Sequence, residues 1–251
     1  MLRVRNVSLA YGTNPILEAI DLDVETGKFA SLIGPSGSGK TSILRAVTEL
    51  MTPLQGTIER GVPLTDIGFL FQDDALLPWR TVRQNVGLGL RIRGASRAAA
   101  NEKADNWLAL LGLGDFGDRF PRQLSGGQRK RVAIAQVLAL EPKLLLMDEP
   151  FASLDAIVRM RITQELMDWV ERERMTVLLV THDLEEAITL SDVVYVLGQG
   201  PRATIRARHD VAIPRPRNVV ETRQDPLFGQ LLKSLWNELS ETTVDQPSPA
   251  A

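Results

Sequence analysis

A glycine-rich segment near residue 40 constrains the fold of this chain more than any other feature. Its eight residues, Gly34-Pro35-Ser36-Gly37-Ser38-Gly39-Lys40-Thr41, match the pattern G-x-x-x-x-G-K-[ST] in full. An apolar run at 29–33 precedes the segment, and an amphipathic stretch at 42–50 follows it. This order predicts a strand, a phosphate-binding loop and a helix, with a glycine-rich turn that binds no ligand as the alternative.

The residue types in this loop indicate how a nucleotide binds. The glycines let backbone N–H groups surround the α- and β-phosphates. Lys40 is expected to reach the β- and γ-phosphate oxygens, and the Thr41 hydroxyl is expected to bind Mg²⁺. The candidate phosphate site therefore comprises Gly34, Pro35, Ser36, Gly37, Ser38, Gly39, Lys40, Thr41 and the adjoining Ser42.

Four near-continuous apolar runs each end in a glycine or a polar residue. Residues 29–33 lead to Gly34, 67–71 to Gln72, 144–147 to Asp148 and Glu149, and 177–180 to Thr181 and His182. Such runs indicate strands that are buried on both faces, and alternating helical segments indicate an α/β fold with a mostly parallel sheet. Ligands bind beyond the carboxyl ends of such strands, so we expect these residues to converge on one site.

The residues at these strand ends predict a hydrolytic site. Asp148 is the expected carboxylate ligand of Mg²⁺, which prefers one or two carboxylates with phosphate oxygens and water. Glu149 would orient or deprotonate a water molecule. His182 would hydrogen-bond the γ-phosphate and that water, and Gln72 would sense the γ-phosphate from a hinge. The alternatives are exposed acids in a turn, a core histidine and a plain polar loop residue.

A second glycine-rich turn, Leu124-Ser125-Gly126-Gly127-Gln128, precedes the basic run 129–131. Ser125 followed three residues later by Gln128 fits a capping box, so an ordinary capped helix is one interpretation. Two glycines at a helix start also let N–H groups approach an anion at the positive helix end. The turn therefore predicts either a capped helix or a second contact with phosphate.

The remaining segments predict one domain over residues 1–240. Antiparallel edge strands are expected at 2–9, 16–24 and 56–59, and helical patterns at 82–90, 98–111 and 125–139 indicate a helical lobe inserted at about 81–139. Tyr11 precedes the sheet core, where it would stack on an adenine ring or only pack. Residues 241–251 are expected to form a disordered tail.

Composition excludes several classes of protein. The net charge of −2 argues against a general nucleic-acid binder, and the absence of cysteine excludes disulfides and thiolate metal sites. No apolar run approaches the roughly 20 residues that span a bilayer, and the first residues lack the apolar core of a signal peptide. We expect a soluble chain that reaches any membrane through partners.

Two surface features stay open at this stage. Leu76, Leu77 and Trp79 predict an exposed docking surface or, alternatively, packing between lobes. Six arginines between 202 and 223 predict a solvated face rather than a contact with lipid headgroups: Arg202, Arg206, Arg208, Arg215, Arg217 and Arg223.

In order and spacing, these motifs resemble the ATP-binding subunit of ATP-binding cassette (ABC) transporters over roughly residues 1–200. The resemblance implies a RecA-like P-loop NTPase core with an antiparallel β subdomain and an inserted helical subdomain. It makes residues 34–41 the Walker A loop, 144–149 Walker B and Gln72 the Q-loop glutamine, which also binds Mg²⁺. By the same match Tyr11 stacks on adenine, His182 is the switch histidine and Ser153-Leu154-Asp155 is the D-loop.

The resemblance also implies what the chain assembles with. Signature residues Ser125, Gly126, Gly127 and Gln128 would face ATP held by a second copy in a head-to-tail dimer. Separate permease subunits and a solute-binding protein would complete a transporter, with this subunit at the cytoplasmic face of the membrane. The D-loop run 150–156 varies slightly from the usual glycine-alanine pair.

A narrower resemblance is to importers of nitrate, sulfonates and taurine. It is carried by Phe71-Gln72, residues 76–80, Asn85-Val86, residues 148–151 and residues 213–217. Three alternatives remain. A lipid-trafficking cassette is disfavoured by the Leu-Leu-Pro-Trp run, and a soluble ABC ATPase usually carries two cassettes or a long coiled-coil insert. A P-loop metabolic kinase would not need residues 124–128 or His182.

Overall fold

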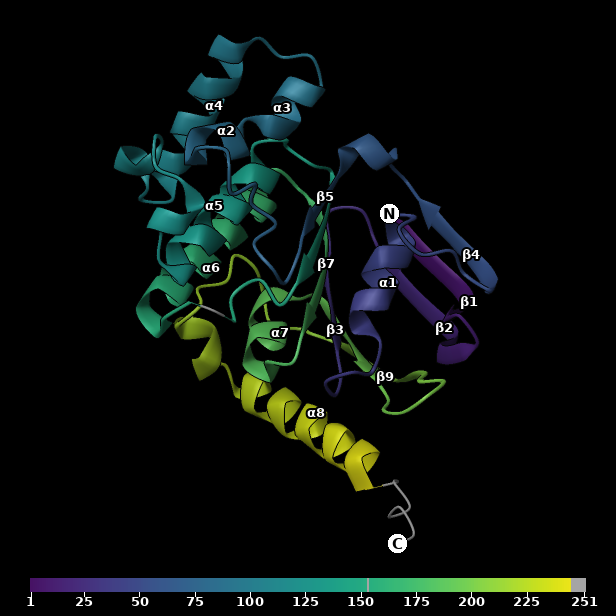
Figure 1. Ribbon diagram of the computed structural model, residues 1–251. Coiled ribbons are helices and arrows are strands. Elements are labelled where there is room, and N and C mark those ends of the chain that lie inside the picture. Colours follow the sequence, from purple (N-terminus) through teal and green to yellow (C-terminus); the bar gives the residue numbers. More distant parts are fainter. Residues whose placement is uncertain (153, 245–251) are drawn as a thin grey trace, which may run out of the picture.

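The computed structural model describes residues 1–152 and 154–244, which form two β-sheets flanked by helices (Figure 1). The smaller sheet is antiparallel, in the order β2-β1-β4, and comprises β1 (Leu2–Tyr11), β2 (Asn14–Val24) and β4 (Gln55–Arg60). Leu2, Val4, Val7 and Leu9 of β1 are buried and alternate with more exposed residues. One face of this sheet therefore covers the core, as expected for an antiparallel edge sheet.

The larger sheet has the order β5-β6-β7-β3-β8-β9 and is parallel except where β9 pairs with β8. Its strands are β3 (Phe29–Ile33), β5 (Ile67–Leu70), β6 (Leu144–Asp148), β7 (Thr176–Thr181), β8 (Val193–Leu197) and β9 (Ile205–Asp210). Strands β3, β6, β7 and β8 are buried at every position. Because β7 lies between β3 and β6, the loop after β3 opens close to the acidic end of β6.

Helices surround the larger sheet and form the predicted lobe. They are α1 (Lys40–Val47), α2 (Val82–Val86), α3 (Leu88–Ile92), α4 (Arg97–Leu110), α5 (Gly126–Leu138), α6 (Ala156–Arg172), α7 (Leu184–Leu190) and α8 (Pro226–Val244). Short 3₁₀ turns are η1 (Leu64–Asp66), η2 (Gly114–Phe116), η3 (Pro121–Gln123) and η4 (Glu221–Gln224). Helices α2 to α5 lie between β5 and β6 in the chain. The single helix expected at 82–90 is divided at Gly87 into α2 and α3.

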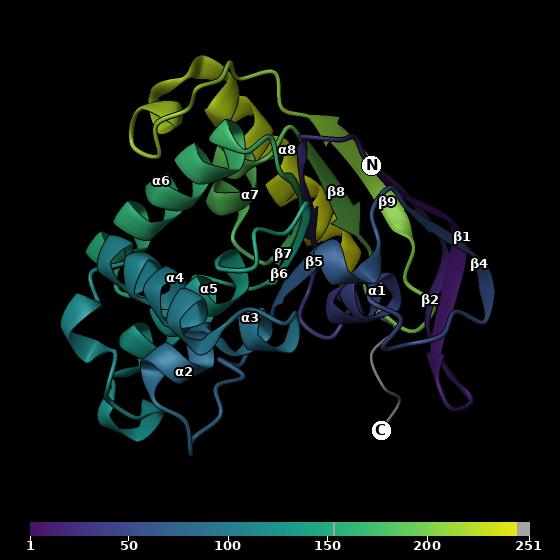
Figure 2. The same cartoon turned by 90° about the horizontal axis from the view of Figure 1, so that it is seen from above.

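Alternate residues of the central strands point into different cores. On β6, Leu144 and Leu146 join the core that α1 and the antiparallel sheet complete. Leu145 and Met147 join the core of α5, α6 and the helical lobe. Since successive strand residues face opposite sides of a sheet, α1 and α5 pack on opposite faces. Figure 2 shows them on either side of the strands.

The C-terminal segment differs from the prediction of a solvated arginine face. Arg217 is 4% exposed and donates hydrogen bonds to the carbonyl oxygens of Ser191 at 2.6 Å and Ile213 at 2.8 Å. Arg215 pairs with Asp192 at 2.8 Å and Glu171 at 2.7 Å. The expectation was wrong for both residues, because a planar guanidinium with five donors can satisfy several acceptors inside the fold.

The end of the chain also extends beyond expectation. Strand β9 and helix α8 follow the arginine-rich stretch, and α8 packs against α7 and β8. Helix α8 continues to Val244, so the expected tail does not begin at 241. Residues 245–251 lie outside the described part of the chain.

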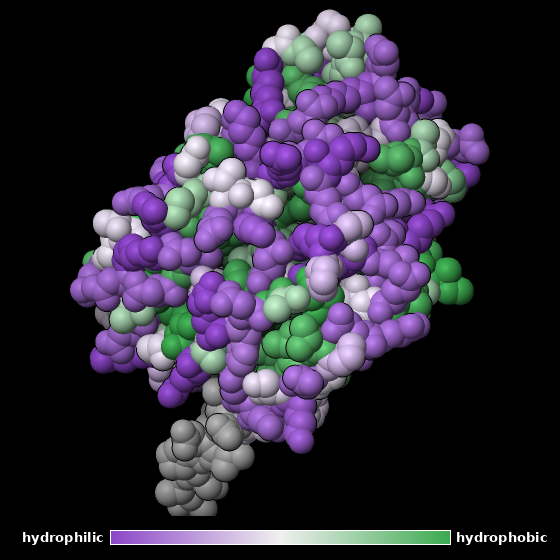
Figure 3. All heavy atoms as spheres, turned by 180° about the vertical axis from the view of Figure 1, so that it is seen from behind, coloured by the Kyte–Doolittle hydropathy of each residue, from purple (hydrophilic) through white to green (hydrophobic). Residues whose placement is uncertain are grey.

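The surface carries separate apolar patches within a mostly polar face (Figure 3). Among the helices of the described residues, none combines the length and apolar character that a membrane span needs. The largest exposed apolar side chains include Trp79, Ile92 and Trp236, at 71%, 78% and 65% exposure.

Candidate active site

The glycine-rich loop after β3 leads directly into α1. Gly37 and Gly39 have φ angles of +77° and +98°, in the region that favours glycine. A Cβ atom on Gly39 would lie 2.6 Å from Cγ2 of Ile16, and one on Gly34 would lie 2.9 Å from the carbonyl oxygen of Leu197. The fold of this subunit therefore requires glycine at both ends of the loop.

Lys40 lies under this loop with 6% of its surface exposed. Its Nζ donates hydrogen bonds to the carbonyl oxygens of Gly34 and Pro35, both at 2.8 Å. Burial lowers the pKa of Lys40, while the nearby carboxylates of Glu149 and Asp148 oppose that shift. The ammonium group thus lies between the loop and two acids, in position to bind an incoming phosphate oxygen.

Asp148 ends β6 beside the loop and is 3% exposed. Burial raises the pKa of Asp148, and a hydrogen bond from the Thr41 side chain together with the charge of Lys40 opposes the increase. A carboxylate in contact with a hydroxyl supplies two oxygen ligands of the kind that Mg²⁺ combines with phosphate oxygens and water.

Glu149, His182 and Gln72 come together at the carboxyl edge of the sheet. Nδ1 of His182 lies 3.0 Å from Oε1 of Glu149, and Nε2 of Gln72 lies 3.5 Å from Oε2 of the same carboxylate. The φ angle of Glu149 is +45°, a strained conformation for a residue other than glycine. Its backbone N–H donates a hydrogen bond to the carbonyl oxygen of Val180 at 2.9 Å, which holds Glu149 beside the end of β7.

Tyr11 is the last residue of β1 and lies beside the first turns of α1. Its hydroxyl accepts a hydrogen bond from Arg45 at 2.8 Å and is 3.4 Å from the hydroxyl of Ser42. The side chain is among the exposed large ones, at 51%. The ring is therefore next to the phosphate loop and open to a ligand face, rather than buried in the core.

The second glycine-rich turn caps α5. The Ser125 hydroxyl accepts a hydrogen bond from the backbone N–H of Gln128 at 3.2 Å, and the Gln128 side chain accepts one from the Ser125 N–H at 2.9 Å. This is the predicted capping box. Among the described residues, a Cβ on Gly127 would come no closer than 3.6 Å, to Leu154, and one on Gly126 no closer than 3.8 Å, to Arg129. Both distances are ordinary contacts, so the described residues leave room for a Cβ atom at both positions.

The signature turn and the D-loop are not brought to the phosphate loop of the same subunit. Helices α5 and α1 cover opposite faces of the sheet, and Ser125 is exposed. Asp155 is exposed and caps α6, where its carboxylate accepts a hydrogen bond from the Val158 N–H at 3.0 Å. Ser153 of the D-loop lies outside the described residues.

Sequence reasoning missed a buried cation next to Gln72. Lys130 is 1% exposed, although its position in a basic run is typical of a solvated helix face. The signal was available in helical spacing: Ala133 and Ile134, three and four residues later, are buried on the same face.

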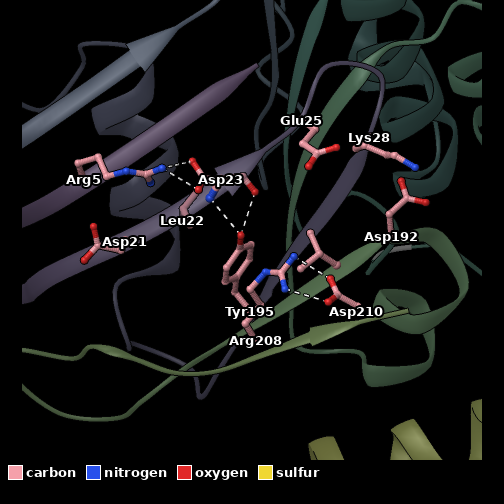
Figure 4. Close-up of a pocket in the computed structure, with 11 residues that line it drawn as sticks. Arg5, Asp21, Leu22, Asp23, Glu25, Lys28, Asp192, Tyr195, Arg208 and Asp210 are labelled. Atoms are coloured by element: carbon pink, nitrogen blue, oxygen red, sulfur yellow. Dashed lines mark hydrogen bonds and ion pairs between the residues drawn. The ribbon is translucent and has the colours of Figure 1, made fainter. Parts of the chain in front are cut away.

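A large cavity of 430 Å³ lies elsewhere, between the two sheets (Figure 4). It opens at the amino ends of β3 and β8, opposite to the phosphate loop. Its polar groups bind one another: Arg5 pairs with Asp23 at 2.7 Å, Arg208 pairs with Asp210 at 2.7 Å, and the Tyr195 hydroxyl donates to the Asp23 carbonyl oxygen at 2.9 Å. Of these contacts, the hydrogen bond from Tyr195 on β8 to Asp23 on β2 joins the two sheets.

The residues at that edge fit a magnesium nucleotide. The hydroxyl oxygen of Ser38 is buried and has no hydrogen-bond partner among the described residues, and open space lies beyond Gly37. Together with Lys40 these groups suit phosphate oxygens. Within the described residues, no group of three or more His, Cys, Asp or Glu side chains could hold a metal. A metal at Thr41 and Asp148 would therefore depend on phosphate and water ligands as well.

Comparison with known proteins agrees with this geometry. The family model for ABC transporters matches residues 17–152, which is more than half of the chain. This chain belongs to the ABC transporter family. As an ABC ATPase it binds ATP with Mg²⁺ and hydrolyses it.

Relatives match over nearly the whole chain. An aliphatic sulfonates import ATP-binding protein of Rhizobium johnstonii is 44% identical over 95% of this chain and 90% of its own length. A nitrate import ATP-binding protein of Synechocystis is 41% identical over 86% of this chain and 85% of its own length. A dimeric ATP-binding cassette solved with ADP and phosphate superposes with a TM-score of 0.77 at 31% identity, covering 85% of this chain and 100% of the other.

Proposed function

We propose that this chain is the ATP-hydrolysing subunit of an importer for a sulfonate, taurine or a nitrate-like anion. The relatives named for sulfonate and nitrate import support this assignment. Its site residues would bind ATP through the loop at 34–42 and Tyr11. A separate permease and a solute-binding protein would complete the transporter, with this subunit at the cytoplasmic face of the membrane.

Thr41 and Asp148 would hold Mg²⁺, with Gln72 completing the protein ligands. The ion would supply charge neutralisation between the β- and γ-phosphates. Lys40 would exchange its carbonyl partners in the loop for phosphate oxygens. Its burial strengthens this interaction, because charges attract more strongly where water is excluded.

Glu149 is positioned to activate the attacking water. One carboxylate oxygen would accept a proton from that water while the water oxygen forms a bond to the γ-phosphorus and the bond to the ADP oxygen breaks. His182 and Gln72, which lie 3.0 and 3.5 Å from the two carboxylate oxygens, would hold the carboxylate in one orientation. The positive φ of Glu149 suits this role, since strained backbone is retained where geometry matters.

The open side of the ATP site requires donors from a second copy. The observation that carries this proposal is the room beside Gly126 and Gly127, where the described part of the subunit accepts a Cβ atom. Glycine at these positions would instead let a phosphate that is held by the partner subunit come close to the backbone N–H groups at the start of α5. Ser125, Gly126, Gly127, Gln128 and Asp155 would complete the partner's site.

The dependence of ATPase activity on protein concentration tests the proposed dimer. ATPase activity per subunit should rise with protein concentration in the isolated protein and level off once dimers predominate. A specific activity that is constant on dilution to the lowest measurable concentration would contradict it.

A groove beside the Q-loop supports docking to a permease. It has a volume of 240 Å³ and is lined by β5, α3 and α5, with Phe71 38% exposed at its edge. Trp79 lies nearby in the chain and is exposed, whereas Leu76 packs against the core. We expect Trp79→Ala to preserve the basal ATPase rate and to weaken its stimulation by the permease.

The substrate is tested by uptake. Proteoliposomes that contain this subunit with its permease and solute-binding protein should accumulate labelled taurine, an alkanesulfonate or nitrate in an ATP-dependent manner. A lipid-trafficking cassette would instead move lipid, and a soluble ABC ATPase would co-purify with nucleic acid or ribosomes rather than with a membrane protein.

A further inference from the structure

Helix α5 carries a buried ammonium group that contacts the Q-loop backbone. Nζ of Lys130 donates hydrogen bonds to the carbonyl oxygens of Phe71 and Gln72, both at 2.9 Å. These two carbonyls belong to the point where the chain leaves the sheet for the helical lobe. At 1% exposure, Lys130 is one of the largest fully buried side chains of the protein.

The surroundings of Lys130 explain why a cation is tolerated there. Burial lowers the pKa of Lys130, and the carboxylates of Asp74 and Asp148 are the leading opposing charges. The two carbonyl oxygens supply direct hydrogen bonds. A buried charge without such partners would be strongly unfavourable, so this contact is a specific feature of the fold.

The next residue reinforces the same connection. Nε of Arg129 lies 3.3 Å from a carboxylate oxygen of Asp74, and its guanidinium donates to the Leu124 carbonyl oxygen at 2.9 Å. The first turns of α5 are therefore attached to the Q-loop at both Gln72 and Asp74.

A continuous series of contacts then joins the signature turn to the water-activating acid. Ser125 caps α5, and Lys130 of the same helix binds the Gln72 backbone. The Gln72 side chain approaches Glu149 at 3.5 Å. Because a helix is stiff over two turns, a shift of the signature turn would also move the Gln72 backbone.

We propose that Lys130 is a positioning residue that orients Gln72 toward Glu149 according to the position of the signature helix. This inference rests on the proposed roles of Gln72 and Glu149. In it, engagement of Ser125 and Gly127 by the partner's ATP sets the geometry of the water-activating acid in the same subunit. Lys130 itself contacts no substrate.

Steady-state ATPase kinetics on the full chain test the proposal with two matched variants. Lys130→Met keeps the length of the side chain and removes its donors, so kcat should fall about tenfold while the KM for ATP changes less than about twofold. Lys130→Gln keeps an amide with two N–H donors and should restore kcat to within about threefold of wild type. Wild-type kcat in Lys130→Met, or equal losses in both variants, would overturn the proposal.

A double-mutant cycle separates positioning from general damage. If Lys130 acts through Gln72, adding Lys130→Met to Gln72→Ala should lower kcat by less than about twofold further. A full additional tenfold loss would show that Lys130 acts elsewhere and would overturn the inference. If Lys130→Met does not unfold cooperatively, Lys130→Ala replaces it in the cycle. The smaller alanine side chain leaves space in which water can hydrate the two carbonyl oxygens.

The same experiment distinguishes this inference from the proposed function. If Gln72→Ala and Glu149→Gln both leave kcat unchanged, the proposed active site is wrong. If Glu149→Gln abolishes turnover and Gln72→Ala lowers kcat to a measurable residual rate while Lys130→Met does not alter kcat, only the role of Lys130 is wrong.

Discussion

The two glycine-rich helix starts of this molecule differ in what their glycines are for. At the start of α1, Gly34 and Gly39 are required by the subunit itself, because a side chain would collide with Leu197 or Ile16. At the start of α5, the described residues leave room for a Cβ atom on Gly126 and Gly127. The start of α1 is suited to a ligand that the subunit itself holds. The start of α5 is suited to a ligand that a second subunit brings to it.

The N-terminal caps of α1 and α5 also differ. Gly39 offers no side chain to the first N–H groups of α1, so no side-chain cap occupies these groups. The start of α5 is closed by a capping box between Ser125 and Gln128 and needs no ligand for stability. A glycine pair in a helix that is already stable is thus better explained by binding than by folding.

The largest expected effect concerns the chemistry beside α1. Glu149→Gln removes the proton acceptor, so kcat should fall by about 10² to 10⁴ while ATP affinity is preserved. ATP should then hold the variant as a dimer, visible by size-exclusion chromatography with light scattering. Turnover at the wild-type rate in this variant would remove Glu149 from its role.

The next largest effect is on ATP affinity, which should depend on the start of α1 and not on the start of α5. Lys40→Ala removes a charge-assisted contact to phosphate and should weaken ATP binding by about 10- to 100-fold, measured by calorimetry. Ser125→Arg should leave the affinity of the monomer for ATP unchanged and abolish ATPase activity. If Ser125→Arg weakens monomer binding as much as Lys40→Ala, the comparison fails.

Alanine at the two kinds of glycine should affect stability unequally. Gly39→Ala places a side chain at φ +98° and against Ile16, and should lower the free energy of unfolding by about 2 kcal/mol or more. Gly127→Ala should change it by less than about 0.5 kcal/mol but still reduce ATPase activity. Urea denaturation measures both, and a destabilised Gly127→Ala would mean that the fold itself needs this glycine.

The last expected effect is a pH dependence of stability that arises from α7. Burial raises the pKa of Glu186, on α7, to about 7, from an unfolded value of 4.5. The folded protein therefore keeps this proton while the unfolded chain loses it, and stability falls as the pH rises from 4.5 through 7. Glu186→Gln should be more stable than wild type by about 1 to 3 kcal/mol at pH 8 and show little gain near pH 4.5. A gain of equal size at both pH values would contradict the shift.

Local patterns were sufficient to predict most of the fold and to place the candidate site residues at one edge of the sheet. The strand runs, the loop at 34–41 and the capping box are short-range features whose spacing carries their structure. Burial of Arg217 and Lys130 depends on carbonyl groups far away in sequence, and β9 depends on pairing with β8. These were not predictable because tertiary packing decides which polar residue is enclosed.

The most direct test of the account mixes two inactive subunits. Glu149→Gln lacks the acid but has an intact signature turn, and Ser125→Arg has the reverse. In a mixed dimer, one site combines the intact acid of one subunit with the intact turn of the other. Equimolar subunits, mixed before ATP is added, should regain ATPase activity above that of either variant alone. About a quarter of wild-type activity is the upper limit, because about half the dimers are mixed and each has one complete site. Coupling of the altered turn to Glu149 through Lys130 in the Ser125→Arg subunit would keep the recovered activity below that limit. Activity no higher than that of the separate variants would contradict a site shared between two subunits.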